Sequence, residues 1–425
     1  MTVRRVVYGL LALAVLLGLA ALAVVALNLR GEEPVADAPA AFNATPAQLE
    51  RGRYLALAGN CAGCHTARGA AAYAGGRGIE TPFGTVYASN LTPDDGTGLG
   101  RWSAAHFWRA MHHGRSRDGR LLYPAFPYTS FTNITREDSD AIYAWLRSVA
   151  PVAQPDIAHR LRFPYNTQAA LAVWRAVSFK PGGFVPDPAK PAEWNRGAYL
   201  VEGLGHCIAC HGGRNVLGAV EEKRGLAGGS IPVENWVAPS LTSTREAGVA
   251  DWELQHVVAL LKTGSSPRGS VMGPMAEVVY RSTQHLAEAD LAAIALYLKQ
   301  LPADPAPPPA PASGTRRDAG TMARGAKIYD QRCAYCHGEA GEGAPGAYPP
   351  LAGSRAVNMA SPHNLIQAVR HGGFLPTTAG NPRPYGMPPF NHVLDDNDIA
   401  AVLSYIRGSW GNDAEPVSQR ETMRR

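Results

Sequence analysis

The sequence predicts a mainly α-helical chain, with three small tandem domains behind one N-terminal transmembrane helix. Two observations predict this organisation: an uncharged apolar run near the N-terminus, and a pattern that occurs three times along the rest of the 425-residue chain. Hydrophobic residues at 46% and charged residues at 18% are typical of globular domains. A formal net charge of +5, with no Lys/Arg run interleaved with aromatic residues, gives no indication of a nucleic-acid partner.

The first element is the run from Val6 to Leu29, which contains no charged residue. As a helix, about 24 residues extend roughly 36 Å, which is enough to cross a bilayer. The apolar region of a signal peptide is normally shorter, about 7–15 residues. We therefore favour an uncleaved anchor at residues 6–29, although an Ala-rich site at residues 36–40 leaves cleavage open. Because Arg4 and Arg5 precede the run, the positive-inside rule places the rest of the chain outside the cytoplasm.

A Cys-x-x-Cys-His motif occurs three times, and the three copies contain all 6 cysteines. They are Cys61-Ala62-Gly63-Cys64-His65, Cys207-Ile208-Ala209-Cys210-His211 and Cys333-Ala334-Tyr335-Cys336-His337. In such a motif the two thiols add to the vinyl groups of a porphyrin and the adjacent His ligates the iron. Structural zinc normally needs a second Cys pair in the same module, whereas these pairs lie more than a hundred residues apart. The sequence therefore predicts three covalently bound haem c groups, with iron ligands His65, His211 and His337.

Each motif lies between two similar helical segments. The leading segments contain Arg51-Gly52, Arg196-Gly197 and Arg324-Gly325, and the closing segments begin near Asp138, Asp290 and Asp398. In the closing segments, apolar and aromatic positions three and four residues apart indicate one buried helix face. The repeated glycine would let the closing helix cross the leading helix closely.

The repeats predict domains at residues 44–160, 190–301 and 318–411. A Pro-rich linker at residues 302–317 separates the second domain from the third. The connector after the first domain contains Phe163, Tyr165 and Trp174, and these aromatic residues predict that it packs on a domain.

The group opposite each iron-ligating His decides the chemistry, because a Met thioether raises the potential and favours electron transfer. Met387 is the candidate in the third domain, since it precedes the closing helix, and Met359 is its rival. In the second domain we favour Met275 over Met272, because Met275 lies nearer the closing helix. The Pro-containing loops Ala238–Leu241 and Tyr348–Leu351 are expected to supply the carbonyl that orients each ligating His.

The first domain differs from the other two. Phe126 stands where the ligating Met would be, and phenylalanine cannot ligate iron. Met111 occupies a core register of the preceding helix, and His112 and His113 follow it directly. The first haem is therefore expected to be five-coordinate, bis-His, or ligated by an unidentified residue.

The chain resembles the membrane-anchored three-haem cytochrome c subunits of bacterial periplasmic dehydrogenases. Besides the three motifs, the matching stretches are Asn90-Leu91-Thr92-Pro93-Asp94, Leu122-Tyr123-Pro124-Ala125, Gly273-Pro274-Met275-Ala276-Glu277-Val278-Val279 and Met387-Pro388-Pro389-Phe390. The resemblance covers nearly the whole chain and implies three tandem class I cytochrome c-like domains. It also implies a periplasmic location behind a single-pass anchor in the bacterial inner (cytoplasmic) membrane. Family members carry electrons from a catalytic subunit to membrane ubiquinone or a terminal oxidase.

The resemblance also bears on the partner. Phe126 departs from the alcohol and gluconate dehydrogenase type, which has Met there. Relatives paired with molybdenum hydroxylases resemble the chain more in residues 123–128, which favours a molybdenum hydroxylase over a flavin or quinoprotein partner. The implied function is electron transfer without catalytic residues of its own. Two alternatives stay open: a haem enzyme that uses an open first haem, and a cytochrome module of a terminal oxidase.

Overall fold

A computed structural model of the chain describes residues 3–35, 43–231, 234–303 and 318–423. The chain is mainly α-helical, as the sequence predicts. It divides into two compact units, one formed by Met1–Leu55 with Cys64–Val185 and the other by Ala56–Gly63 with Pro186–Arg425. Most of the predicted Pro-rich linker, and the Ala-x-Ala-like site at residues 36–40 that left cleavage open, lie outside the described residues.

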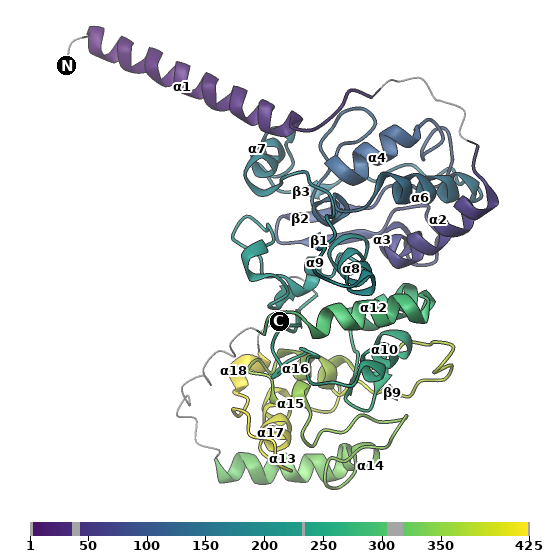
Figure 1. Cartoon of the computed structure of the whole chain (residues 1–425). Coiled ribbons are helices and arrows are strands. Elements are labelled where there is room, and N and C mark those ends of the chain that lie inside the picture. The colour runs from purple at the N-terminus through teal and green to yellow at the C-terminus, as the bar shows by residue number, and fades with distance from the viewer. Residues whose placement is uncertain (1–2, 36–42, 232–233, 304–317, 424–425) are drawn as a thin grey trace. The chain divides into compact units, whose positions relative to one another are not determined.

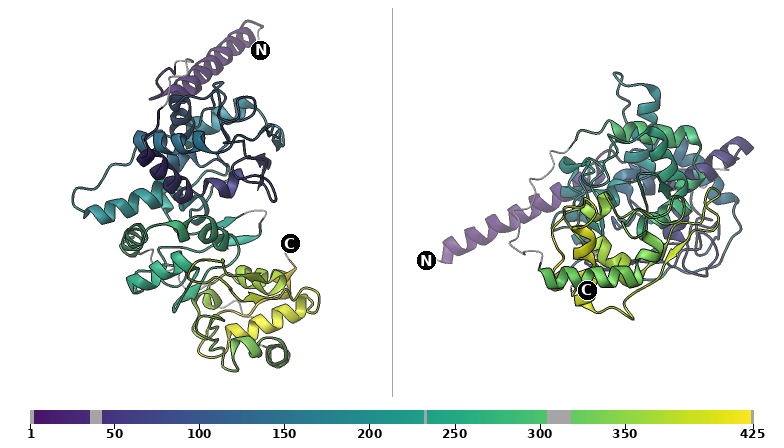
Figure 2. Two further views of the ribbon diagram at one scale, coloured as in Figure 1. Left: turned by 90° about the vertical axis from the view of Figure 1, so that its right-hand side faces the viewer. Right: turned by 90° about the horizontal axis from the view of Figure 1, so that it is seen from below.

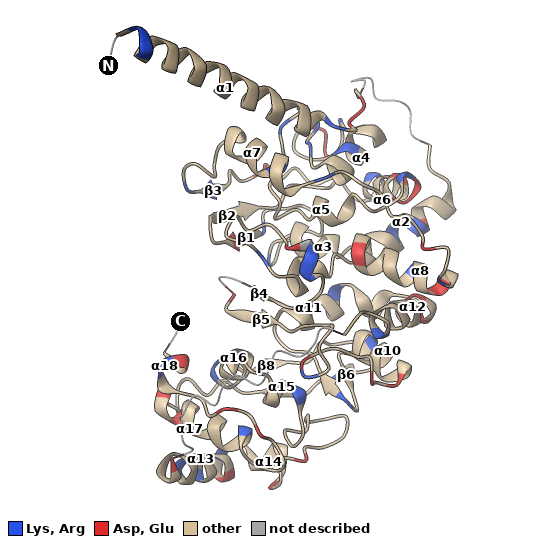
Figure 3. Cartoon of the chain, turned by 60° about the vertical axis from the view of Figure 1, so that its left-hand side comes forward, with Lys and Arg blue, Asp and Glu red and all other residues tan. Residues whose placement is uncertain are grey.

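Helix α1 (Val3–Leu29) is long and apolar enough to cross a membrane, with a mean hydropathy of 3.0 over its most apolar window. The predicted span at residues 6–29 lies entirely within it. Figures 1 and 2 show α1 extending well beyond the rest of the first unit. Lys/Arg colour appears only at its N-terminal end in Figure 3, at Arg4 and Arg5. Its leucine and valine side chains are largely exposed, as expected of a helix that faces lipid.

The first predicted domain contains short helices around a small antiparallel sheet (Figure 1). Its elements, followed by those of the connector, are α2 (Pro46–Ala58), α3 (Cys61–His65), β1 (Gly78–Thr81), β2 (Gly84–Tyr87), α4 (Ala104–His113), α5 (Tyr128–Phe131), α6 (Arg136–Ser148), β3 (Arg160–Leu161) and α7 (Gln168–Ser178). The sheet order is β1-β2-β3. Because β3 pairs with β2, the start of the connector is part of this sheet.

The second and third predicted domains repeat this arrangement within the second unit. The second contains α8 (Ala192–Ala198), the π-helical turn η1 (Tyr199–Leu204), α9 (Ile208–His211), η2 (Glu222–Arg224), β4 (Gly229–Ile231), β5 (Trp236–Ala238), α10 (Leu254–Thr263), β6 (Ser265–Ser266), β7 (Gly269–Ser270), α11 (Pro274–Arg281), η3 (Thr283–His285) and α12 (Glu288–Lys299). The third contains α13 (Ala319–Arg332), α14 (Ala334–His337), α15 (Arg355–Asn358), α16 (His363–His371), β8 (Gly373–Phe374), β9 (Gly386–Met387), α17 (Asp396–Arg407) and α18 (Gln419–Thr422). All of the strand pairs are antiparallel.

The same close helix crossing occurs in each of the three repeats. A glycine of the leading helix lies against the backbone of the closing helix, so that an added Cβ would overlap a carbonyl oxygen. The pairs are Gly52 with Ala141, Gly197 with Ala293, and Gly325 with Ala401. The close crossing that the repeated glycine predicts is therefore confirmed in all three repeats.

An ion pair accompanies each crossing. The arginine before the glycine donates from Nε to Oδ1 of the aspartate that opens the closing helix, at 2.8 Å in every repeat. The pairs are Arg51–Asp138, Arg196–Asp290 and Arg324–Asp398. The aspartate lies in the first turn of its helix, where a negative charge also interacts favourably with the helix dipole. The pair therefore fixes the beginning of the closing helix against the leading helix.

A double-mutant cycle on Arg196→Met and Asp290→Asn is expected to give a coupling free energy of about 1 kcal/mol. The pair is bidentate, with Nε–Oδ1 at 2.8 Å and Nη2–Oδ2 at 2.7 Å, and partly buried, so water screens it incompletely. The exposed pair Arg120–Asp118 serves as the control, with an expected coupling below about 0.5 kcal/mol. Equal coupling in the two cycles, measured by hydrogen exchange of the adjoining helices, would contradict the structural role of Arg196–Asp290.

The connector packs on the first domain, as predicted, but not through all of its aromatic residues. Tyr165 packs on Phe83, with ring centroids 4.5 Å apart, and Leu171 is buried. Phe163, however, is 81% exposed, so the expectation that this ring packs on a domain is wrong. Backbone pairing through β3 holds this part of the connector and leaves the Phe163 ring outside.

Candidate haem-binding sites

Each Cys-x-x-Cys-His motif lies at a short helix that follows the leading helix of its repeat. The first motif forms α3, and the second and third end in α9 and α14. Asn60, immediately before the first motif, has a positive φ of 50°, and its side chain lies against Gly63. The tight turn brings the two cysteines and the histidine of one motif together in a single helical turn.

Each of the three iron-ligand candidates makes the same kind of hydrogen bond. The ring Nδ1 of His65, His211 and His337 lies 2.7, 2.8 and 3.1 Å from the carbonyl oxygens of Ser89, Pro239 and Pro349, respectively. Donation from Nδ1 to a carbonyl fixes the tautomer in which Nε2 keeps its lone pair for a metal. The two loops predicted from their prolines do supply the acceptor, and Ser89 supplies it in the first domain.

Burial lowers the pKa of each of these three imidazoles below its ordinary value, against the opposing effect of the carbonyl hydrogen bond. The rings are therefore neutral at physiological pH, the form that ligates iron. All six cysteines are free of disulfides. Burial also raises the pKa of Cys207 to about 12 and that of Cys333 to about 11. These cysteines are accordingly protonated thiols in the protein without its cofactor.

These donor sets fit haem c and do not fit zinc. Each provides two cysteine thiols and one neutral, oriented imidazole, which are the groups that covalent haem attachment requires. In the part of the chain that the structure describes, no three His, Cys, Asp or Glu side chains are arranged to hold a metal ion. The motifs are thus not halves of a zinc site within those residues.

The methionine candidates lie where the sequence places them relative to the helices. Met387 is in β9, between α16 and α17, and packs against the core of the third domain. Its rival Met359 directly follows α15 and is 6% exposed. Arg407 donates a hydrogen bond to the Met359 carbonyl. This supports Met359 as a core residue and leaves Met387 as the candidate ligand.

In the second domain, Met275 is in the first turn of α11, after a sharp turn at Gly273. The turn is fixed because the indole ring of Trp236 lies directly against Gly273, where a Cβ would overlap it. The terminal methyl group of Met272 instead faces Gly373 of the third domain. These positions are compatible with the choice of Met275 over Met272, which stays a prediction.

The first domain holds Phe126 in an aromatic cluster. Its ring centroid lies 5.4 Å from that of Phe131 and 6.4 Å from that of Tyr128, so Phe126 is a packing residue. Met111 is buried in α4, which agrees with the predicted core position. These packing contacts give no support to Phe126 or Met111 as an iron ligand.

His112 and His113 end α4, close to this cluster in sequence. The His112 ring stacks on Trp108, with centroids 4.3 Å apart. The Nδ1 atoms of both histidines are buried, and neither has a hydrogen-bond partner among the described residues. Burial, together with the charges of His112 and Arg175, lowers the pKa of His113 to about 4. Burial also lowers the pKa of His112, so both imidazoles are neutral at physiological pH.

Within the second unit, the third domain contacts the loop that orients His211. The side-chain amide of Asn364, on α16, donates to the carbonyl of Val237 at 2.8 Å and accepts from its N–H at 2.9 Å. Val237 is two residues before Pro239, which accepts the hydrogen bond of His211. Arg355 adds a second link, to the Gly248 carbonyl at 2.7 Å. The histidine-orienting loop of one haem motif is thus held by the next domain.

The second unit also contains residues 56–63, which lead into the first motif. The ring Nε2 of His206 lies 3.3 Å from the Gly59 carbonyl, and Ser282 Oγ donates to the Ala58 carbonyl at 3.1 Å. Because His206 immediately precedes Cys207, the chain segments that enter the first and second motifs are hydrogen-bonded neighbours.

A cytochrome c family model matches the regions that contain the first and the third motif. These regions are residues 49–150 and 322–410. The chain is 40% identical over 389 residues to the cytochrome c subunit of alcohol dehydrogenase (quinone) from Gluconacetobacter polyoxogenes, covering 88% of this chain and 82% of that protein. It is 38% identical to the gluconate 2-dehydrogenase cytochrome c subunit of Pantoea cypripedii, covering 88% of each.

A further relative is much longer than this chain. One of the subunits of nicotinate dehydrogenase from Pseudomonas putida is 42% identical over 393 residues, which cover 91% of this chain and 32% of that protein. The chain thus spans about a third of that relative's length.

Proposed function

The chain belongs to the family of cytochrome c subunits of bacterial dehydrogenase complexes, and we propose that it carries electrons through three covalently bound haem groups. The observation that carries the proposal is the threefold occurrence of one donor set, in which two cysteines accompany a histidine oriented by a backbone carbonyl. Its repetition on the same helix crossing supports the proposal of three attachment sites.

Haem supplies reversible one-electron chemistry, and the protein tunes it by ligation and burial. In the proposal, the six cysteines hold the three porphyrins, and His65, His211 and His337 ligate the irons. Met275 and Met387 would supply a second protein ligand to the iron in the second and third domains. The carbonyl hydrogen bond fixes each imidazole in one tautomer. Because the ring donates its Nδ1–H in this bond, the basicity of Nε2 toward the iron also increases.

Contacts between the motif-bearing segments support transfer among the haems. Asn364 holds the loop that orients His211, and His206 bonds to the segment that enters the first motif. These hydrogen bonds limit the relative motion of neighbouring attachment segments.

The proposed location is the bacterial inner (cytoplasmic) membrane, with the haem domains in the periplasm. The apolar surface of α1 and the two arginines at its N-terminal end support this orientation. A membrane anchor would keep the cytochrome close to its acceptor, for which we propose membrane ubiquinone or a terminal oxidase.

For the electron donor we propose a separate catalytic dehydrogenase subunit, a molybdenum hydroxylase in preference to a flavin or quinoprotein enzyme. Phe126 supports this choice, as does the similarity to a nicotinate dehydrogenase subunit. Affinity purification of the chain from its native membrane tests it directly. A copurifying molybdenum subunit is expected, whereas terminal oxidase subunits would indicate the alternative role as an oxidase module.

Haem analysis of the purified chain tests the main proposal. Intact-protein mass and the pyridine haemochrome spectrum are expected to show three haem groups for each chain, because all three donor sets are alike. Two or fewer haem groups after full maturation would contradict the proposal.

Carbon monoxide distinguishes electron transfer from catalysis at the first haem. The packing of Phe126 motivates the alternative of an open first haem that reacts with small ligands. That alternative would be contradicted if electron paramagnetic resonance shows three low-spin haems and carbon monoxide causes no absorbance change. A high-spin haem that binds carbon monoxide rapidly would favour it over a purely electron-transferring role.

A further inference from the structure

The outward face of α7 is apolar, although the connector lies on the surface of its unit. Val173 and Val177, four residues apart, are 52% and 69% exposed. The only charged residue of the helix, Arg175, is instead 2% exposed and lies over the ring of Phe179. A helix that faces water normally places its polar residues outward. The pattern of α7 is the reverse, which indicates that its outward face is covered in the working protein.

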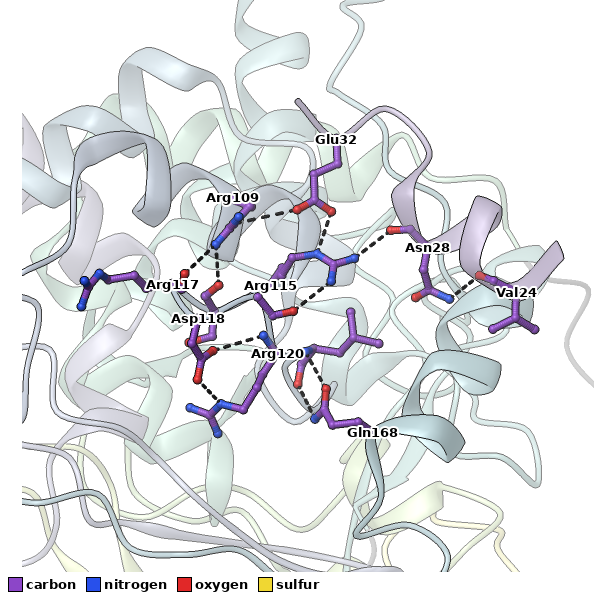
Figure 4. A network of polar contacts seen from close by, with 12 residues as sticks. Val24, Asn28, Glu32, Arg109, Arg115, Arg117, Asp118, Arg120 and Gln168 are labelled. Atoms are coloured by element: carbon purple, nitrogen blue, oxygen red, sulfur yellow. Dashed lines mark hydrogen bonds and ion pairs between the residues drawn. The ribbon is translucent and has the colours of Figure 1, made fainter. Parts of the chain in front are cut away.

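Helix α7 is bound directly to the end of α1. Asn28 donates from Nδ2 to the Ala172 carbonyl at 2.9 Å, and Arg115 Nη2 donates to the Asn28 carbonyl at 3.1 Å. The Arg115 guanidinium also pairs with Glu32, with Nε and Oε2 2.8 Å apart, and the Glu32 side chain is only 8% exposed. Figure 4 shows this network between α1 and the first domain. A partly desolvated, charge-assisted pair of this kind holds its elements more firmly than an exposed one.

The N-terminal end of α7 is fixed to the first domain. Gln168 accepts from the Leu121 N–H at 2.8 Å and donates to the Leu121 carbonyl at 3.1 Å (Figure 4). The position of α7 relative to the last turn of α1 is therefore set by hydrogen bonds at both Gln168 and Ala172.

The length of α1 gives the level of α7 relative to a bilayer. Its 27 residues extend about 40 Å, more than the hydrocarbon core of about 30 Å. Asn28, in the last turn, then lies in the headgroup region. Because Ala172 is hydrogen-bonded to Asn28, α7 lies at the same level.

The segments that flank α7 have the composition of a membrane interface. Phe163 is 81% exposed and Tyr165 and Val185 are also exposed, while the basic residues Arg162 and Lys180 lie on the surface. Exposed aromatic and aliphatic side chains next to Lys and Arg are typical of segments that lie on an anionic lipid surface.

We infer that α7 and its flanking residues form a second membrane contact, with Val173 and Val177 inserted among the lipids of an anionic bilayer beside α1. The inference rests on the proposed anchoring by α1. Such a contact would fix the orientation of the first domain on the membrane surface, in addition to tethering it there.

Site-specific photo-crosslinking in the full-length chain tests this contact. The probe p-benzoylphenylalanine replaces Val177, Leu17 of α1, or Glu137 in separate variants, and each haem-loaded protein is placed in nanodiscs of phosphatidylethanolamine and phosphatidylglycerol. Glu137 is an exposed position on α6, which lies away from α1 and α7 within the first unit (Figure 1). Lipid adducts are identified by mass spectrometry.

The expected result is lipid adducts at Leu17 and Val177, with the yield at Val177 at least about fivefold above that at Glu137. Adducts at Leu17 but only background at Val177 would overturn the inference and leave the anchor intact. No adduct at Leu17 would overturn the anchor and the inference together. Adducts at Val177 to a copurified protein instead of lipid would assign the face to a protein partner and also overturn the inference.

A charged variant gives an independent readout. Val173→Asp with Val177→Asp is expected to speed hydrogen exchange of residues 168–178 several-fold in nanodiscs, because carboxylates leave the lipid. In detergent-free nanodiscs the matched change Val216→Asp, at a fully exposed site in the second domain, should leave α7 exchange unchanged. Unchanged exchange in the double variant would contradict insertion of these valines.

Discussion

Replacing Met387 with leucine is expected to lower the potential of the third haem by more than about 0.1 V, within the span of about 0.8 V that axial ligands cover. Leucine fills a similar volume but cannot ligate iron, so in the proposed ligation the iron would lose the thioether that stabilises its reduced form. Spectroelectrochemical titration of the full-length protein measures the shift. The low-spin absorbance of one haem of the three is expected to change with it.

Met359→Leu is the matched control in the same domain. Met359 is buried, and its carbonyl is bound by Arg407, so leucine should pack in its place without altering any iron ligand. The two variants therefore separate ligation from packing. If Met359→Leu lowers the potential and Met387→Leu does not, the assignment of Met387 is wrong.

Replacing Gly325 with alanine is expected to destabilise the third domain by about 3 kcal/mol. An added methyl group would overlap the carbonyl oxygen of Ala401 and meet the Cβ of Tyr405. Neither can move without separating α13 from α17, the pair of helices that carries most of the core of this domain. Hydrogen exchange of α13 and α17 in the full-length chain gives the free energy of opening.

Gly320→Ala is the control for this prediction, because Gly320 lies on the same helix but outside the crossing. The nearest atom to an added Cβ there is Asp318 Oδ2 at 3.2 Å, and a shift of a few tenths of an ångström makes room while the N-cap hydrogen bond to Thr321 is kept. Alanine is expected to leave the domain as stable as before or to stabilise it by up to about 1 kcal/mol. Equal exchange in the Gly325→Ala and Gly320→Ala variants would show that the crossing does not limit stability.

The sequence predicts those parts of the site that depend on local signals. The three motifs, and the prolines of the loops that orient His211 and His337, are recognisable because each acts within about thirty residues of its partner. Ser89, the acceptor for His65, was not predicted because it is not a proline. The repeat nevertheless aligns Asn90 with Ser240, and therefore Ser89 with Pro239. When a residue acts through its backbone carbonyl, its side-chain type gives no signal in the sequence, and only its position in the aligned repeat indicates the role.

Long-range pairing does not follow from the sequence pattern. The arginine of each leading helix and the aspartate of each closing helix are separated by 74 to 94 residues. The pattern shows both residues in every repeat but not that they meet. Their contact follows from the angle at which the helices cross, which glycine permits but does not by itself define.

Helix α7 shows a different limit. Its periodicity would place Val173 and Val177 in the core and Arg175 in water, because apolar residues normally face inward. The structure has the opposite arrangement. Buried aromatic rings accept the guanidinium, and the valines remain outside. An inverted pattern of this kind is interpretable only when the neighbouring element, here α1, is known.

The hydrogen bonds of Asn28 and Arg115 have a consequence for how the first domain would meet a membrane-bound acceptor. A domain on a flexible tether samples many orientations, so only a fraction of its encounters with a membrane-bound acceptor are productive. The ion pair with Glu32 removes that rotational averaging, since the first domain cannot turn independently of its helix. An acceptor diffusing in the plane of the bilayer would then always meet the same edge of the protein. Its lateral concentration, and not domain reorientation, would set the encounter rate.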